Sequence, residues 1–178
     1  MTVIAAVVNK NGSYIAGDRG ASDSNVIFPL AHSKVWQLGQ YLFGYFGSMD
    51  GEKVMYSFSP PPLKTKNIDK FMLTEFTTAL KEFYDEHFVF IGDKEMDFGM
   101  IIVAGGYIYE HDAGTMSMTR FETNYLSVGS GSEYALGSLH TSEAWADGKR
   151  RVRTAVESAI KYSPSCMGPV DVIGITNK

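Results

Sequence analysis

Residues 2–18 read TVIAAVVNKNGSYIAGD, and this stretch decides the fold. An apolar run ends at Asn9, Asn11-Gly12 is a dipeptide typical of tight turns, and a second run continues from Ser13 to Gly17. A strand, a short turn and a second strand form a β-hairpin. No basic stretch precedes the apolar run, so we interpret it as a strand rather than a signal peptide and expect a cytoplasmic protein.

The same pattern recurs outward from this hairpin. Residues 34–38 and 41–46 flank Gly39-Gln40, and residues 100–104 and 107–110 flank Gly105-Gly106. Both pairs are predicted hairpins. Further strands are expected over residues 120–128 and 170–175. Residues 18–25 are polar and predict a connection.

Helical periodicity separates these groups of strands. A helix is expected within 48–59, where Pro60-Pro61-Pro62 ends it. Between residues 67 and 90, apolar side chains recur at helical spacing and predict an amphipathic helix of about six turns. These side chains are Leu73, Phe76, Leu80, Phe83 and Tyr84. Residues 132–139 and a buried stripe from Val152 to Ile160 predict two more helices.

The order of elements predicts an α+β protein. Hairpins join most strands, so the sheets should be largely antiparallel, with helices packed against them. The 178 residues contain no repeat or linker that divides them. We therefore expect one domain over residues 1–178.

Composition excludes several classes of protein. Hydrophobic residues make up 44% and charged residues 20% of the chain, as in an ordinary globular protein, and we expect no membrane partner. The net charge of -4 argues against nucleic acid as a partner. A single cysteine, Cys166, excludes zinc sites built mainly from thiolates.

Other polar motifs have plain interpretations. Residues 129–134 lack the third glycine of a dinucleotide-binding loop, so no cofactor is expected. Glu110-His111-Asp112 is interpreted as an exposed strand end rather than a metal site. The basic run over 149–153 is interpreted as the solvated outer face of a helix, with contact to an acidic partner subunit as the alternative.

Thr2 carries the most informative chemistry. If Met1 is removed, one residue supplies both a hydroxyl nucleophile and an α-amine base, whose reference pKa is about 7.7–8.0. Asp18 follows the second strand and Lys34 opens the third. These positions can meet at one sheet edge, where the lysine would favour deprotonation of the hydroxyl and the aspartate would orient the lysine.

Thr2, Ala16-Gly17-Asp18 and Lys34 together resemble the N-terminal-nucleophile hydrolases of the proteasome β-subunit superfamily, most closely the bacterial HslV peptidases. The resemblance covers nearly the whole chain and implies a four-layer αββα sandwich. It also implies that Thr2 is the nucleophile, that Asp18 and Lys34 are its electrostatic partners, and that the Gly44 amide is the oxyanion donor. The motif around Gly129-Ser130-Gly131 implies that the Ser130 hydroxyl lies beside the N-terminal amine.

The function implied is a threonine peptidase that forms a homo-oligomeric ring and hydrolyses peptides or unfolded proteins, with an ATP-dependent unfoldase as a possible partner. Exposed aromatic residues, including Tyr45 and Tyr134, are then expected at subunit contacts. Proteasome-type members often carry an aspartate before the last strand, where this chain has Ser163-Pro164-Ser165. Two alternatives stay open: a non-catalytic ring or scaffold protein that retains Met1, and a non-peptidase amide hydrolase of the same superfamily.

Overall fold

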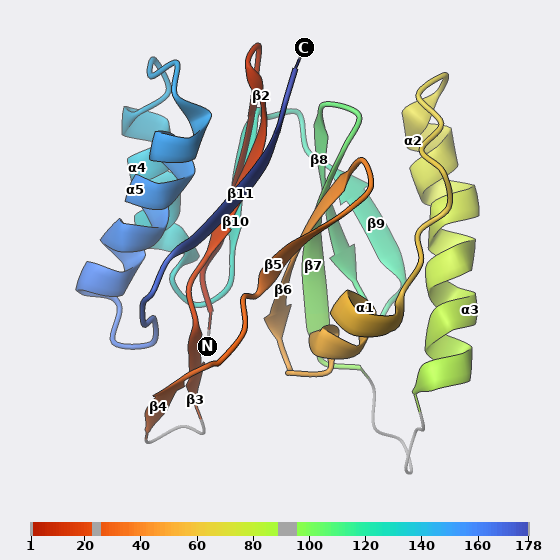
Figure 1. The fold of residues 1–178 in the computed structure, drawn as a ribbon, viewed down its shortest axis with the longest axis horizontal. Coiled ribbons are helices and arrows are strands. Elements are labelled where there is room, and N and C mark those ends of the chain that lie inside the picture. The colour runs from red at the N-terminus through yellow and green to blue at the C-terminus, as the bar shows by residue number, and fades with distance from the viewer. Residues whose placement is uncertain (1, 23–25, 89–95, 178) are drawn as a thin grey trace.

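The computed structural model describes residues 2–22, 26–88 and 96–177. Two sheets stack face to face, and helices cover the outer face of each sheet, so four layers follow one another across the molecule (Figure 1). The predicted α+β architecture, a four-layer αββα sandwich with antiparallel sheets, is confirmed.

The first sheet contains the opening hairpin. Its strand order is β10-β1-β2-β11, and every neighbouring pair is antiparallel. The strands are β1 (Ile4–Asn9), β2 (Gly12–Gly17), β10 (Tyr125–Val128) and β11 (Asp171–Thr176). Side chains alternate between the two faces of a strand, so Ile4 and Ala6 of β1 face the second sheet while Val3, Ala5 and Val7 pack toward the helices.

The second sheet has the order β5-β6-β7-β8-β9. Its strands are β5 (Val35–Leu38), β6 (Tyr41–Gly47), β7 (Phe98–Ala104), β8 (Tyr107–Asp112) and β9 (Ser117–Arg120). The single strand predicted over 120–128 is wrong, because the chain leaves this sheet after Arg120 and enters the first sheet at Tyr125. A short additional hairpin, β3 (Gly20–Ser22) with β4 (Ile27–Pro29), occupies part of the predicted connection.

Helices α4 (Ser132–Thr141) and α5 (Gly148–Tyr162) cover the first sheet (Figure 1). On the other side lie α1 (Gly51–Ser57), α2 (Ile68–Phe71), the π-helical turn η1 (Met72–Phe76) and α3 (Thr77–His87). Residues 89 and 90 of the predicted long helix lie outside the described residues. A π turn holds more residues than an α turn and shifts the buried face. Met72 is therefore buried, whereas Leu73 is 55% exposed and does not belong to the core.

Three residues that the sequence placed at the surface are buried, namely Arg151, His111 and Tyr45. Arg151 therefore does not share the solvated outer face predicted for the basic run, because its Nη2 donates to the Leu139 carbonyl between the helices. His111 contacts the Ser117 carbonyl through Nδ1 and the Tyr84 hydroxyl through Nε2. Tyr45 lies in the aromatic core and cannot serve as an exposed subunit contact.

Candidate active site

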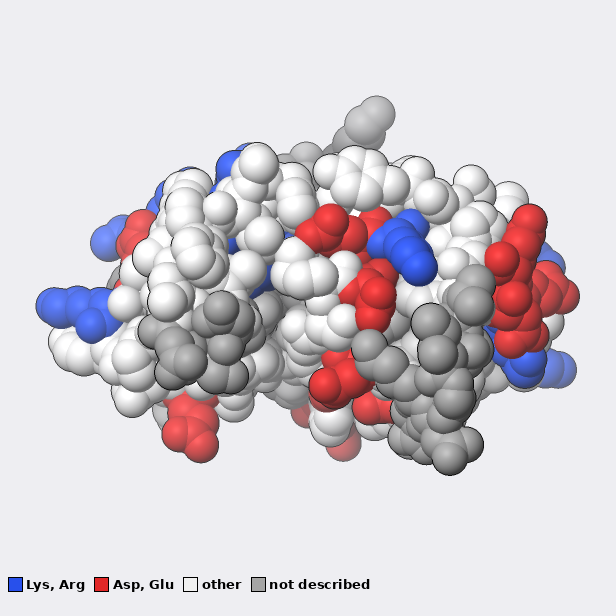
Figure 2. Space-filling model, turned by 90° about the horizontal axis from the view of Figure 1, so that it is seen from below, with Lys and Arg blue, Asp and Glu red and all other residues white. Residues whose placement is uncertain are grey.

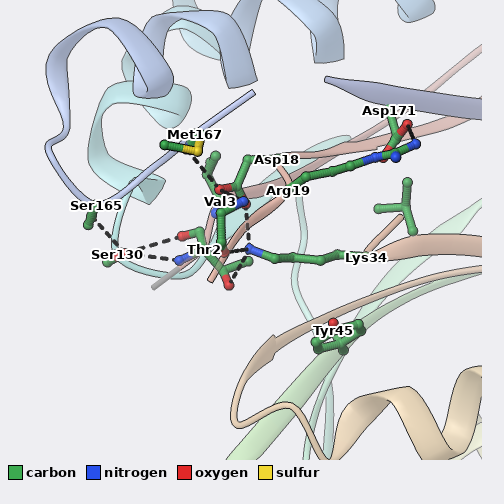
Figure 3. Close-up of polar contacts among 12 residues, drawn as sticks. Thr2, Val3, Asp18, Arg19, Lys34, Tyr45, Ser130, Ser165, Met167 and Asp171 are labelled. Atoms are coloured by element: carbon green, nitrogen blue, oxygen red, sulfur yellow. Dashed lines mark hydrogen bonds and ion pairs between the residues drawn. The ribbon is translucent and has the colours of Figure 1, made fainter. Parts of the chain in front are cut away.

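Thr2, Asp18 and Lys34 meet at the N-terminal end of the first sheet (Figure 3). The Lys34 ammonium group donates to Thr2 Oγ1 over 2.9 Å and to Asp18 Oδ1 over 2.8 Å. The three residues that the sequence analysis placed at one sheet edge therefore form one hydrogen-bonded cluster.

The strand register explains this meeting. Ile4 pairs with Gly17 across β1 and β2, so the residue that follows Gly17 lies beside the start of β1. Asp18 accepts a hydrogen bond from the Val3 amide over 3.0 Å and returns its own amide to the Val3 carbonyl over 3.2 Å. Lys34 directly precedes β5 of the other sheet, so its side chain crosses between the sheets to reach both partners.

Asp18 is fully buried, and protein groups donate four hydrogen bonds to its carboxylate. Its Oδ1 accepts from Lys34 Nζ and Val3 N, and its Oδ2 accepts from the amides of Gly20 and Met167 over 3.0 and 3.2 Å. These donors compensate the carboxylate for the loss of water, and the carboxylate holds the ammonium group in one position.

Lys34 is only 1% exposed. Burial lowers the pKa of Lys34, and the Asp18 carboxylate opposes that shift. Besides its two side-chain partners, Nζ donates to the Gly20 carbonyl over 2.5 Å. An ammonium group that donates to Thr2 Oγ1 would stabilise negative charge on that oxygen and favour its use as a nucleophile.

Ser130 contacts the other reactive atom of Thr2. Thr2 N lies 3.1 Å from Ser130 Oγ, as the resemblance implied. Ser165 Oγ donates to Ser130 Oγ over 3.0 Å, and the hydroxyls of Ser163 and Ser165 lie 2.7 Å apart. Three serine hydroxyls thus form a chain that ends at the nitrogen of Thr2, and Figure 3 shows Ser165, Ser130 and Thr2. The sequence analysis did not assign Ser163 or Ser165 to the site, although the Ser-Pro-Ser motif marks the position.

Gly44 is the one predicted site residue that does not join the cluster. The Tyr45 amide donates to the Lys34 carbonyl, and successive amides of an antiparallel strand point to opposite neighbours, so the Gly44 amide points toward β7. By the same alternation the Gly47 amide points to the side of β6 on which β5 lies. β5 begins at Val35, which pairs with Gly44, so Gly47 extends past the end of β5. Gly47 is exposed, with φ at 87°.

The state of the Thr2 nitrogen depends on Met1, which lies outside the described residues. In a chain that retains Met1 this nitrogen is an amide and cannot accept a proton. Thr2 itself is buried, with 3% exposure.

Cys166 is the other nucleophilic side chain near the cluster. It is buried, and burial together with the negative charge of Asp18 raises the pKa of its thiol. A thiol with a raised pKa holds less of the reactive thiolate at neutral pH. Cys166 is therefore a poor competitor of Thr2.

Figure 2 views the end of the molecule at which the N-terminus lies. Acidic side chains gather in the middle and at one side of this face, and basic side chains are fewer there.

Within the part of the chain that the structure describes, no three His, Cys, Asp or Glu side chains are grouped as metal ligands. No helix in the described ranges is long and apolar enough to cross a membrane.

Neither protein-family models nor curated proteins give a match to this chain. Solved structures do. Thiobacillus denitrificans BPH in complex with epoxomicin matches with a TM-score of 0.77 at 19% sequence identity over 98% of both chains. A second structure of the Thiobacillus protein gives 0.77 at 18% identity over 98% of this chain and 97% of that one. Eukaryotic HslV from Trypanosoma brucei gives 0.71 at 18% identity over 98% of this chain and 99% of that one. The chain therefore has the proteasome-type fold of HslV, and the resemblance seen in the sequence is confirmed at the level of the fold.

Proposed function

We propose that this chain, which has the fold of HslV, is a subunit of a proteasome-like threonine peptidase, with Thr2 as nucleophile once Met1 has been removed. One observation carries the proposal: Lys34 Nζ lies 2.9 Å from Thr2 Oγ1, with the buried Asp18 carboxylate behind it. Burial of the Lys34–Asp18 ion pair carries a desolvation penalty. A role in activating the Thr2 hydroxyl explains why such a pair is placed beside it.

In the proposed reaction, the free α-amine of Thr2 accepts the Oγ1 proton as Oγ1 attacks the peptide carbonyl carbon. Lys34 stabilises the charge that develops on Oγ1, and Ser130 orients the amine. The tetrahedral intermediate then collapses, the departing amine takes the proton from the Thr2 ammonium, and an ester to Thr2 remains. Water attacks this ester and gives one proton to the amine. The bond between the acyl carbon and Oγ1 then breaks, the Thr2 ammonium returns that proton to Oγ1, and the acid is released.

The carbonyl oxygen becomes an oxyanion in the intermediate and needs a donor. The Gly47 amide is better placed for this role than the Gly44 amide, because it points to the β5 side and is exposed. Gly44 instead fills a position between the sheets, where an added Cβ would lie 2.7 Å from Ile4 Cγ2. Gly44 thus has a packing role in this proposal.

The subunit is proposed to act as one domain in a homo-oligomeric cytoplasmic ring on peptides or unfolded proteins, with an ATP-dependent unfoldase as a possible partner. Exposed Tyr134 is available for a subunit contact. The fold shared with HslV supports this proposal.

A second candidate function is a non-catalytic ring or scaffold protein. If Met1 stays in place, the Thr2 nitrogen is an amide and cannot act as the base. The buried position of Thr2 also favours this alternative. A non-peptidase amide hydrolase would use the same residues on a small amide.

Hydrolysis of fluorogenic peptides, of an unfolded protein and of small amides by chains that begin at Thr2 tests the proposal. Matched chains would retain Met1 or carry Thr2→Ala. We expect turnover only from the chain with a free Thr2 amine. Inactivity of all three chains would favour the scaffold, and turnover of small amides alone would favour the amide hydrolase.

A further inference from the structure

A cavity of about 240 Å³ lies at the opposite end of the first sheet from Thr2. Its wall comes from the turn Asn9 to Asn11, from Asn124, from the α4–α5 connection and from Arg151. In Figure 1 the turn between β1 and β2 and the connection between α4 and α5 both lie at the end away from the N-terminus. The proposed peptidase reaction uses none of these residues.

The mouth of this cavity is held together by side-chain amides. Asn9 Nδ2 and Asn11 Nδ2 both donate to the Ala146 carbonyl, over 3.1 and 3.0 Å. The Asn11 amide also donates to Asn9 Oδ1 over 2.9 Å. These bonds join the strand turn to the helix connection, so the cavity is formed before any ligand enters.

Arg151 supplies a buried cation with an unused donor. The residue is 1% exposed, and its Nη2 donates to the Leu139 carbonyl over 3.0 Å. Its guanidinium carbon lies 5.8 Å from the centre of the Tyr125 ring. Its Nε is buried and has no hydrogen-bond partner among the described residues. A buried N–H without an acceptor costs about 1–3 kcal/mol, so the hydrogen-bonding capacity of the Arg151 guanidinium group is not fully used in this position.

The charges around the cavity favour an anion. Lys10 and Arg151 contribute two cations to its wall, against one carboxylate from Glu143. Glu143 is exposed and makes no ion pair with Arg151 within the described ranges. Burial lowers the pKa of Arg151, and Glu143 opposes this only in part. Nearby negative charge therefore balances the positive charge of the Arg151 guanidinium group only in part.

We propose that this cavity binds a small carboxylate anion, which pairs with the guanidinium group of Arg151 and lies near Lys10 and the Asn124 side-chain amide. Planar carboxylates match guanidinium donors, and the amide of Asn124 can donate to a second carboxylate oxygen. A water molecule occupies about 30 Å³ of liquid, so the cavity has room for an acid of a few carbon atoms.

Equilibrium dialysis of the intact protein with radiolabelled acetate and succinate, at constant ionic strength, tests this proposal. We expect saturable binding of a carboxylate, and no competition from acetamide, which has a similar shape but no charge. Two substitutions at the mouth leave the buried arginine in place. Glu143→Gln should tighten binding several-fold because it removes a repelling charge, and Asn124→Asp should weaken it at least tenfold because it adds one.

Glu157→Gln is the matched control, since it makes the same charge change on the exposed face of α5 away from the cavity. It should leave binding unchanged. Four results would overturn the proposal: no saturable binding, which would mean that water alone fills the cavity; equal competition by acetamide; the same response to Glu157→Gln as to Glu143→Gln; or preferential binding of inorganic phosphate.

Discussion

Ser165 Oγ donates to Ser130 Oγ over 3.0 Å, and Ser130 Oγ lies 3.1 Å from the nitrogen of Thr2. The proposed base of the reaction is thus connected to a chain of neutral hydroxyl groups. A neutral chain orients the α-amine without the charge that would raise the pKa of the amine.

This relationship predicts the pH dependence of activity. Ser165→Asp should move the acidic limb of the kcat/KM profile to higher pH, because a nearby carboxylate favours the protonated amine. Ser165→Ala should lower kcat with little movement of that limb. The kcat/KM profiles of both variants are compared with that of wild type. Identical profiles for Ser165→Asp and wild type would show that position 165 does not influence the pKa of the amine.

Removal of the Lys34 ammonium group should affect activity and stability separately. Lys34→Ala should reduce peptidase activity at least about a thousandfold because Thr2 Oγ1 loses its donor. It should also cost about 3–5 kcal/mol of unfolding free energy, since the fully buried Asp18 carboxylate loses its counter-ion.

A second substitution distinguishes these two effects. Adding Asp18→Asn to Lys34→Ala should restore part of the stability but none of the activity, as measured by urea denaturation and peptide hydrolysis. Recovery of activity in the double variant would contradict an electrostatic role of Lys34 in the reaction.

Gly44→Ala should disturb the sheet that carries Thr2. The new Cβ would lie 2.7 Å from Ile4 Cγ2 and 3.0 Å from Ile15 Cδ1, so the sheets must move apart. We expect a loss of about 1–3 kcal/mol in unfolding free energy, as for overpacked cores, together with reduced kcat. Gly39→Ala is a less suitable control because Gly39 has a positive φ of 57°. Gly137→Ala in α4 meets no atom within 4 Å and should not reduce stability.

Acid should destabilise the protein through His111. Burial lowers the pKa of His111 to about 4, whereas an unfolded histidine titrates near its ordinary value of 6.5. The unfolded chain therefore binds the proton first, and the unfolding free energy should fall as pH drops from about 6.5 toward 4, by roughly 1.4 kcal/mol for each pH unit.

His111→Gln keeps a polar group beside Tyr84 and should flatten this part of the stability profile, even if it lowers stability at neutral pH. Denaturant titrations between pH 4 and 7 check the slope. An equal slope in wild type and His111→Gln would assign the acid sensitivity to other groups.

The sequence predicts the site better where strands carry it than where loops do. The two-residue turn Lys10-Asn11 joins the paired residues Asn9 and Gly12 and fixes the β1–β2 register, and that register brings Asp18 beside Val3. Ser165 lies in a loop without periodicity, so hydrophobic periodicity does not link it to Ser130, 35 residues away, and only the resemblance pointed to this stretch. Its role depends on long-range contacts that only the folded chain defines.

Periodicity also fails where the helix changes its pitch or where charge is buried. A stripe counted at α-helical spacing placed Leu73 in the core, but the π turn brings Met72 there instead. Arg151 belongs to a basic run, yet the carbonyl of Leu139 and the ring of Tyr125 give it an interior site. Partners of this kind cannot be found from the local pattern of charge.

The central claim is that Thr2 becomes the nucleophile when its nitrogen is an amine. Mass spectrometry after reaction with an electrophilic peptide tests it most directly, on chains that begin at Thr2 and on matched chains that retain Met1. We predict one covalent adduct, mapped to Thr2, on the first chain and none on the second. Equal labelling of both chains, or labelling at Cys166 in place of Thr2, would contradict the threonine mechanism.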